Sequence, residues 1–254
     1  LGSLSRYVEA YGHLWFSRLE LGPVVVAATL VQATVAGVVL ILLPVVVARR
    51  RKRLHGSSAP PSASWTILHF GMIGLGFMAL EMLLIQKATL ILGDPVYSAA
   101  AVITAILIWA GVGSGTSGRI RNAAVTKIAG AGLTVAVLAV ATVMGIDGLG
   151  TVFARLSQAL RFAAVVFVLA PVSFAMGWLF PSGLQRLDEL RGEAGLALAV
   201  NGVASVIAAP LAVLISSSLG FSALLAGAVA CYLAAATLAF LSRRVVYSTT
   251  TRRP

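Results

Sequence analysis

One acidic side chain stands in the middle of an apolar segment, where a charge is costly. The segment GFMALEMLLIQKATLILGDPVY (76–97) carries Glu81 inside a hydrophobic run, and Gln86 and Lys87 follow it. An ionised carboxylate in the core of a bilayer costs at least about 2.5–3.5 kcal/mol, so such a group faces protein or water, is paired, or is protonated. Glu81 is therefore the first candidate for chemistry, because an anion in a low-dielectric site attracts a cation.

Possible partners for this carboxylate lie elsewhere in the chain. Gln32 and Asn201 are strongly polar residues expected near the middle of the membrane, and we predict that both face the same interior as Glu81. Lys87 lies six positions after Glu81 and so points to another side of the helix. We expect its ammonium either to extend to the outer headgroups or to pair with Asp94.

The remaining sequence contains no recognisable catalytic set. Cys231 is the single cysteine, so this chain forms neither an internal disulfide nor a cysteine metal cluster, and we expect this residue to serve in packing. We find no Ser/His/Asp set in a plausible order, no metal cluster of His and carboxylates, and no carboxylate pair on one face. His69 is interpreted as a residue at a helix end near the membrane surface rather than a ligand. No metal or cofactor site is predicted.

Glycine and proline residues are expected to shape the helices. The glycines of GVGSG (111–115) do not fit a dinucleotide fingerprint, which follows a strand and needs an acidic residue about twenty positions later. Gly111 and Gly115 instead have the spacing of a close helix contact. Pro171 and Pro210 are expected to bend their helices. The segment FPSGLQRL (180–187) is expected either to end its helix or to open a cavity lined by carbonyl groups.

The composition indicates a membrane protein. Of 254 residues, 59% are hydrophobic and only 11% are charged, whereas a soluble domain carries about a quarter charged residues. The formal net charge is +11, but the basic residues form short clusters between apolar runs. That pattern orients spans in a bilayer and does not indicate nucleic-acid binding.

Seven segments are long and apolar enough to cross a bilayer as helices of about 20 residues. We therefore predict an all-α, polytopic bundle of seven transmembrane helices in the cell membrane. The expected spans are 22–48, 66–92, 97–117, 127–147, 160–184, 196–218 and 221–242. Tight turns are expected at 93–95 and 216–220, where glycine ends an apolar run.

The distribution of basic residues predicts the orientation. With the N-terminus outside, most of the 19 Lys and Arg residues fall in loops on one side: the run 49–53, Arg119, Arg121, Lys127, Arg186, Arg191, Arg243, Arg244, Arg252 and Arg253. The opposite side holds only Arg6, Arg18, Arg155 and Arg161. Since cytoplasmic loops carry the excess of Lys and Arg, we expect the N-terminus outside and the C-terminus in the cytoplasm.

Three domains are expected along the chain. Residues 1–21 mix aromatic and charged side chains and are interpreted as an interfacial segment, 22–242 as the seven-helix membrane domain, and 243–254 as a basic cytoplasmic tail. Residues 149–161 place apolar side chains at helical spacing. They are interpreted as a short helix on the outer membrane surface or as an amphipathic connector.

Several blocks of this sequence resemble a known family. They are GLGFMALEMLLIQKATLILGDPVYSAAAVITAILIWAGVGSG (74–115), FPSGLQRL (180–187), AVNGVASVIAAPLAVLISSSLGFSALLAGAVACYLAA (199–235) and VVVAATLVQATVAGVVLILLPVVV (24–47). They are similar to multi-spanning bacterial proteins described as spermidine-synthase-like or as membrane-bound S-adenosylmethionine-dependent methyltransferase-like. The family's polar signature falls on Glu81, Gln86, Gly93, Pro95, Tyr97, Gly113, Ser114, Pro181, Gly183, Asn201 and Gly202.

The sequence departs from the family pattern at two positions. Lys87 stands where an Arg is expected, which weakens any bidentate contact with an anion. Asp94 stands where the family often has His, so a proton-handling role of that turn is in doubt.

The resemblance implies that the enzyme activity belongs to another domain. In such proteins a soluble domain that binds an S-adenosylmethionine-type cofactor accompanies the membrane part, and it would carry aminopropyltransferase-like or methyltransferase-like activity. This sequence contains no such domain, and residues 1–21 are then expected to be its tail. The expected partners are the lipid bilayer and that domain or other membrane subunits.

Three hypotheses for function follow. The first is a membrane domain that anchors a catalytic domain and offers a polar pocket for an amine-like substrate, lined by Glu81, Gln86, Lys87, Gln32, Asn201 and Tyr97. The second is a transporter or proton-coupled carrier that uses Glu81 as its titrating group. The third is a structural subunit of a larger membrane complex, in which Glu81 satisfies a neighbouring helix or another chain.

Overall fold

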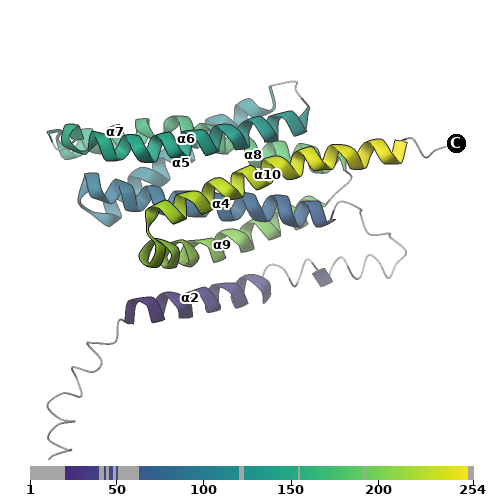
Figure 1. The fold of residues 1–254 in the computed structure, drawn as a ribbon, viewed down its shortest axis with the longest axis horizontal. Helices are drawn as coiled ribbons and strands as arrows, with labels where there is room; N and C mark the ends of the chain where they lie inside the picture. Colours follow the sequence, from purple (N-terminus) through teal and green to yellow (C-terminus); the bar gives the residue numbers. More distant parts are fainter. Residues whose placement is uncertain are drawn as a thin grey trace, which may run out of the picture.

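The computed structural model of the chain is a bundle of long helices (Figure 1). It describes residues 21–39, 63–119, 123–153, 155–190 and 193–250, together with a few isolated positions between 43 and 50. The described part contains helices and turns and no strand. The expected all-α class is therefore confirmed for these residues. The proposed interfacial segment 1–21 and the end of the basic tail lie outside them, apart from Leu21.

The helix boundaries follow the apolar runs of the sequence. The helices are α2 (Leu21–Gly37), α4 (Ala63–Leu92), α5 (Pro95–Ser117), α6 (Ala124–Phe153), α7 (Gln158–Val168), α8 (Ala170–Glu189), α9 (Ala194–Leu219) and α10 (Phe221–Thr250). Apart from α8, each of them is rich in Leu, Ala, Val and Ile, and a helix satisfies its own backbone hydrogen bonds in an apolar environment.

Five described helices are long and apolar enough to cross a membrane, and the bent pair α7 and α8 makes a sixth if it forms one span. These six match the expected spans from 66–92 to 221–242. The expected first span, 22–48, is represented by α2, which is a shorter apolar helix of 17 residues. Residues 40–42 and most of 44–49 lie outside the described part, so the seventh span stays a prediction.

Successive helices from α4 to α10 run back and forth between two ends of the bundle, with α7 and α8 acting as one unit (Figure 1). One end holds the turn at Gly93, the start of α7 and the turn at Gly220, and we call it the Gly93 end. The other holds the start of α6 and the end of α8, and we call it the Arg186 end. The described basic loop residues of the expected cytoplasmic side thus lie together, at the Arg186 end.

Two turns at the Gly93 end have the expected positions. Gly93 and Gly220 have φ angles of 75° and 85°, which glycine adopts without the steric cost that other residues incur. Asp94 then caps α5, because its carboxylate accepts a hydrogen bond from the Tyr97 amide at 2.7 Å. Pro95 occupies the first turn of α5, where no amide donor is required.

The two interpretations of residues 149–161 have different outcomes, since the structure is compatible with an amphipathic connector. A separate surface helix over 149–161 is wrong, because α6 continues to Phe153 and α7 begins at Gln158 after a short turn. The expected bend near Pro171 is confirmed, since α7 and α8 meet at Leu169 with a change of direction of 43°. Pro181 lies inside α8, which continues to Glu189, so FPSGLQRL does not end the helix.

The core surrounds α4, which packs against α9, α10 and α5. Leu80, Leu83 and Leu84 of α4 are fully buried, and Tyr232 of α10 is buried beside them. Large apolar side chains also cover the outside of the bundle, among them Leu107, Met144 and Leu198. An exterior of this kind is suited to contact with lipid.

The closest helix crossing is not at the pair of glycines that the spacing suggested. Gly111 and Gly115 face open space, so the predicted close contact there is wrong. Gly113 of α5 instead lies against the Phe174 carbonyl of α8, and Gly177 of α8 lies against the Ala110 carbonyl of α5. A Cβ atom at either glycine would overlap the facing carbonyl, so small residues permit this backbone approach.

Candidate functional site

Glu81 lies near the middle of α4 and is half buried. Among the described residues it forms no hydrogen bond and no ion pair. Tyr232 is buried on α10, and its hydroxyl has no hydrogen-bond partner in the described part. The described part of the bundle therefore supplies neither a hydrogen bond nor a counter-charge to the Glu81 carboxylate.

The structure does not bring Gln32 and Asn201 together with Glu81. Asn201 on α9 donates its amide hydrogen to the Phe70 carbonyl at 3.2 Å. Phe70 precedes Glu81 by eleven residues, about 16 Å along a helix. Gln32 is exposed on α2, which packs against α9. The expected shared interior of the three side chains is thus not present in the described part.

Lys87 pairs with a residue that the sequence did not suggest. Its ammonium lies 2.6 and 2.8 Å from the two carboxylate oxygens of Asp147 near the end of α6. The lysine side chain is 9% exposed and that of Asp147 is 53% exposed, while the Phe221 ring lies 5.3 Å below the ammonium. The expected alternatives, extension to the headgroups or a pair with Asp94, are both wrong.

Gln86 and Tyr97 also lie apart from Glu81. Gln86 is five residues after Glu81, which turns it about 140° around the helix. Tyr97 is at the start of α5, where its ring lies 5.0 Å from that of Phe162 and, with Asp94 and Gln158, borders an open hollow at the Gly93 end. Binding at these residues therefore stays a prediction, and it cannot use a single pocket.

The hollow at the Gly93 end is lined by Asp94, the start of α5 and Gln158 of α7, and polar side chains of α7 also contact the end of α4. Gln158 donates to the Leu92 carbonyl at 3.1 Å, and Arg161 donates to the carbonyls of Ile91 and Leu156. These carbonyls belong to helix and turn ends that lack partners of their own. The polar side chains here therefore close the end of α4 rather than form a catalytic set.

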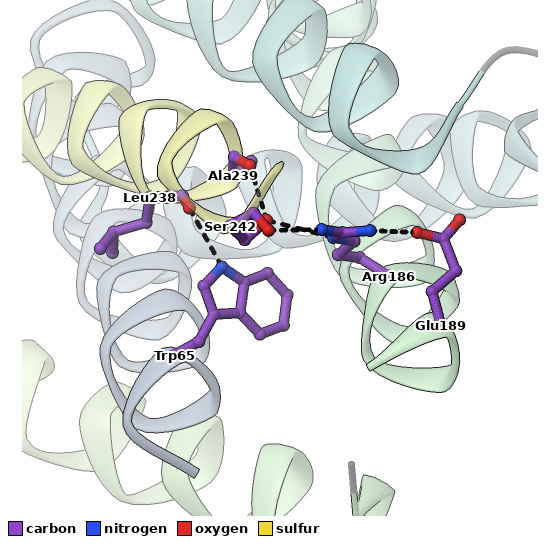
Figure 2. Close-up of polar contacts among 6 residues, drawn as sticks. All are labelled: Trp65, Arg186, Glu189, Leu238, Ala239 and Ser242. Atoms are coloured by element: carbon purple, nitrogen blue, oxygen red, sulfur yellow. Dashed lines mark hydrogen bonds and ion pairs between the residues drawn. The ribbon is translucent and has the colours of Figure 1, made fainter. Parts of the chain in front are cut away.

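A second polar cluster, at the Arg186 end, was not expected from the sequence (Figure 2). Arg186 on α8 donates to the hydroxyl of Ser242 at 3.1 Å and to its carbonyl at 2.8 Å, and it pairs with Glu189 at 2.6 Å. The Trp65 indole donates to the Leu238 carbonyl at 3.2 Å. α4, α8 and α10 are thereby joined, although Arg186 had been counted as an ordinary loop cation.

His69 lies inside the bundle rather than at its surface. It is fully buried, stacks on Trp65 at 4.5 Å, and meets the edge of Phe70. Neither ring nitrogen has a hydrogen-bond partner in the described part, and Gly183 of α8 lies close to the Nε2 atom. His69 lies near the start of α4, as expected, but its ring packs between helices rather than at the surface, because Gly183 leaves room for it within the core.

The described residues contain no group of three His, Cys, Asp or Glu side chains that could hold a metal ion. No family model, curated protein or solved structure matches this chain.

Proposed function

We propose that this chain is the membrane domain of a larger protein similar to the spermidine-synthase-like family, and that it anchors a catalytic domain. The observation that supports this role is the use of polar side chains at both ends of the bundle. Lys87 with Asp147, and Arg186 with Ser242, connect helices to one another. Between these ends α4 packs in an apolar core, which suits a domain that serves as a membrane anchor.

The orientation in this proposal rests on the basic residues. Arg119, Lys127 and Arg186 lie at the Arg186 end, which we assign to the cytoplasm because cytoplasmic loops carry the excess of Lys and Arg. The C-terminus would then be cytoplasmic and α2 would begin outside. The catalytic domain would be connected to the outer end of α2.

The anchor role is tested with the full-length product of the natural gene. Membrane and soluble fractions are assayed for S-adenosylmethionine-dependent methyl transfer and for aminopropyl transfer, before and after deletion of residues 22–250, which removes every expected span. The proposal predicts that one of these activities is bound to membranes in the intact protein and soluble after the deletion. An activity that stays with the membranes after the deletion, or a gene product with neither activity, contradicts it.

A second candidate function is the binding of an amine at Glu81. It is favoured by one observation: the half-buried carboxylate in mid-span has no partner among the described residues. A protonated amine would supply the missing charge. Equilibrium dialysis of the purified protein with labelled spermidine should then show binding that Glu81→Gln abolishes. Equal binding by both proteins rejects this second function and leaves the anchor role intact.

A further inference from the structure

A groove between α6 and α8 has not been used in any function considered so far. It has a volume of about 390 Å³, within the range of ligand pockets. α6 contributes a row of residues at helical spacing, and two aromatic side chains of α8 face that row. The lining residues used below are Thr126, Lys127, Gly130, Thr134, Phe174 and Trp178.

The groove has a positive charge at one end. Lys127, in the first turn of α6, is 5% exposed, and its ammonium donates to the Ser117 carbonyl at the end of α5, at 3.3 Å. This contact holds the ammonium at the Arg186 end of the groove. Arg119 adds a second cation near the same helix end. An anion at this position is favoured, because opposite charges attract strongly near the membrane surface.

The rest of the groove is apolar and has fixed walls. Phe174 and Trp178 lie one turn apart on α8, with ring centres separated by 6.1 Å. The Trp178 indole donates to the Thr116 hydroxyl at 3.1 Å, which fixes its orientation. A tryptophan near the end of a span is favoured at the level of the lipid headgroups.

The groove opens to the surroundings of the bundle. Thr126, Gly130 and Thr134 are exposed, and a Cβ atom built on Gly130 would meet no other atom. From Thr126 to Thr134 the groove extends about 12 Å along α6. Since α6 is long and apolar enough to cross a membrane, we expect lipid beside this stretch.

We propose that the groove between α6 and α8 binds one anionic phospholipid. Its phosphate lies at Lys127, and one acyl chain lies along Gly130 and Thr134 against Phe174 and Trp178. The apolar length and the charge at one end match an amphiphile whose head is anionic. With the Arg186 end in the cytoplasm, this lipid belongs to the inner leaflet.

The test uses the purified protein, freed of lipid in detergent and titrated with phosphatidylglycerol or phosphatidylcholine. Bound lipids are counted by native mass spectrometry. We expect one phosphatidylglycerol to bind about tenfold more tightly than phosphatidylcholine, since basic residues near the surface each add to the attraction of an anionic lipid. Equal affinities for the two lipids overturn the proposal, and so does equally tight binding of free glycerol phosphate, which would indicate a simple anion site.

Three variants locate the lipid. Gly130→Leu fills the groove and should weaken phosphatidylglycerol binding at least about tenfold. Gly145→Leu is the matched control, because Gly145 lies on the same helix, also faces open space and does not line the groove. Lys127→Met should lower the preference for the anionic lipid by about fivefold.

The pattern among the variants decides the result. Weaker binding in Gly130→Leu together with unchanged binding in Gly145→Leu supports the site. Binding that Gly130→Leu leaves unchanged, or a lipid preference that Lys127→Met leaves unchanged, contradicts it. The thermal unfolding of each variant is measured beside its binding, and a folded variant is one whose transition matches that of the wild type.

Discussion

Several polar residues of the described part connect helices, whereas the Glu81 carboxylate forms no hydrogen bond or ion pair there. Lys87 binds Asp147 near the Gly93 end, and Arg186 binds Ser242 near the Arg186 end, so each connects two helices. Asn201 connects α9 to α4 within the bundle, because its side-chain amide donates a hydrogen bond to the Phe70 carbonyl. Glu81 has no such contact among the described residues. Of the six residues predicted to line a pocket, Lys87 and Asn201 are engaged in contacts between helices, and binding at the others stays a prediction.

The Lys87–Asp147 pair gives the first prediction. Asp147→Asn leaves an ammonium almost buried without its anion and should lower the free energy of unfolding by about 1–3 kcal/mol. Lys87→Met replaces that charge by an apolar side chain of similar length and should cost less. Unfolding in detergent, followed by circular dichroism, measures both changes.

The control for this prediction is Asp188→Asn, since Asp188 is exposed on α8. It should change the stability by less than about 0.5 kcal/mol. If Lys87→Met lowers the free energy of unfolding more than Asp147→Asn does, the ion pair does not stabilise the Gly93 end as described.

At the scale of the helices, most of the architecture follows from hydropathy. Six expected spans have counterparts because an apolar run of about 20 residues has few alternatives to a helix. Turns at Gly93 and Gly220 were also predictable, since only glycine readily adopts their positive φ angles. The pairing of Lys87 with Asp147 was not predictable, because the two residues are 60 positions apart and meet only through the packing of α4 against α6.

The crossing of α5 and α8 gives the second prediction. Gly113→Ala and Gly177→Ala each place a methyl group against a carbonyl of the other helix, so the helices must separate. Each change should lower the free energy of unfolding by about 1–3 kcal/mol. Thermal unfolding in detergent compares them with wild type.

Two other glycines of α5 provide matched controls. Gly111→Ala and Gly115→Ala add the same methyl group where nothing lies within 4 Å. They should be neutral or slightly stabilising, because alanine favours a helix over glycine. A loss of stability in these controls equal to that in Gly113→Ala would mean that the crossing is not at Gly113.

At the scale of the whole molecule, the two ends of the bundle differ in charge, and this difference sets the proposed orientation. The third prediction uses single cysteines in a Cys231→Ala background. Val96→Cys at the Gly93 end should react with a membrane-impermeant maleimide in intact cells. Gly118→Cys at the Arg186 end should react only after the cells are made permeable. The reverse pattern would place the Arg186 end outside.

The proposed anchor role implies that the bundle supports another domain and does not transport a substrate across the membrane. The measurement that tests it most directly is uptake by vesicles reconstituted with the protein, using labelled spermidine under an imposed pH gradient while proton flux is recorded. We expect wild type and Glu81→Gln to show no more spermidine uptake or proton flux than vesicles without protein. Saturable uptake or proton flux by the wild type that Glu81→Gln abolishes would contradict the claim and identify a carrier.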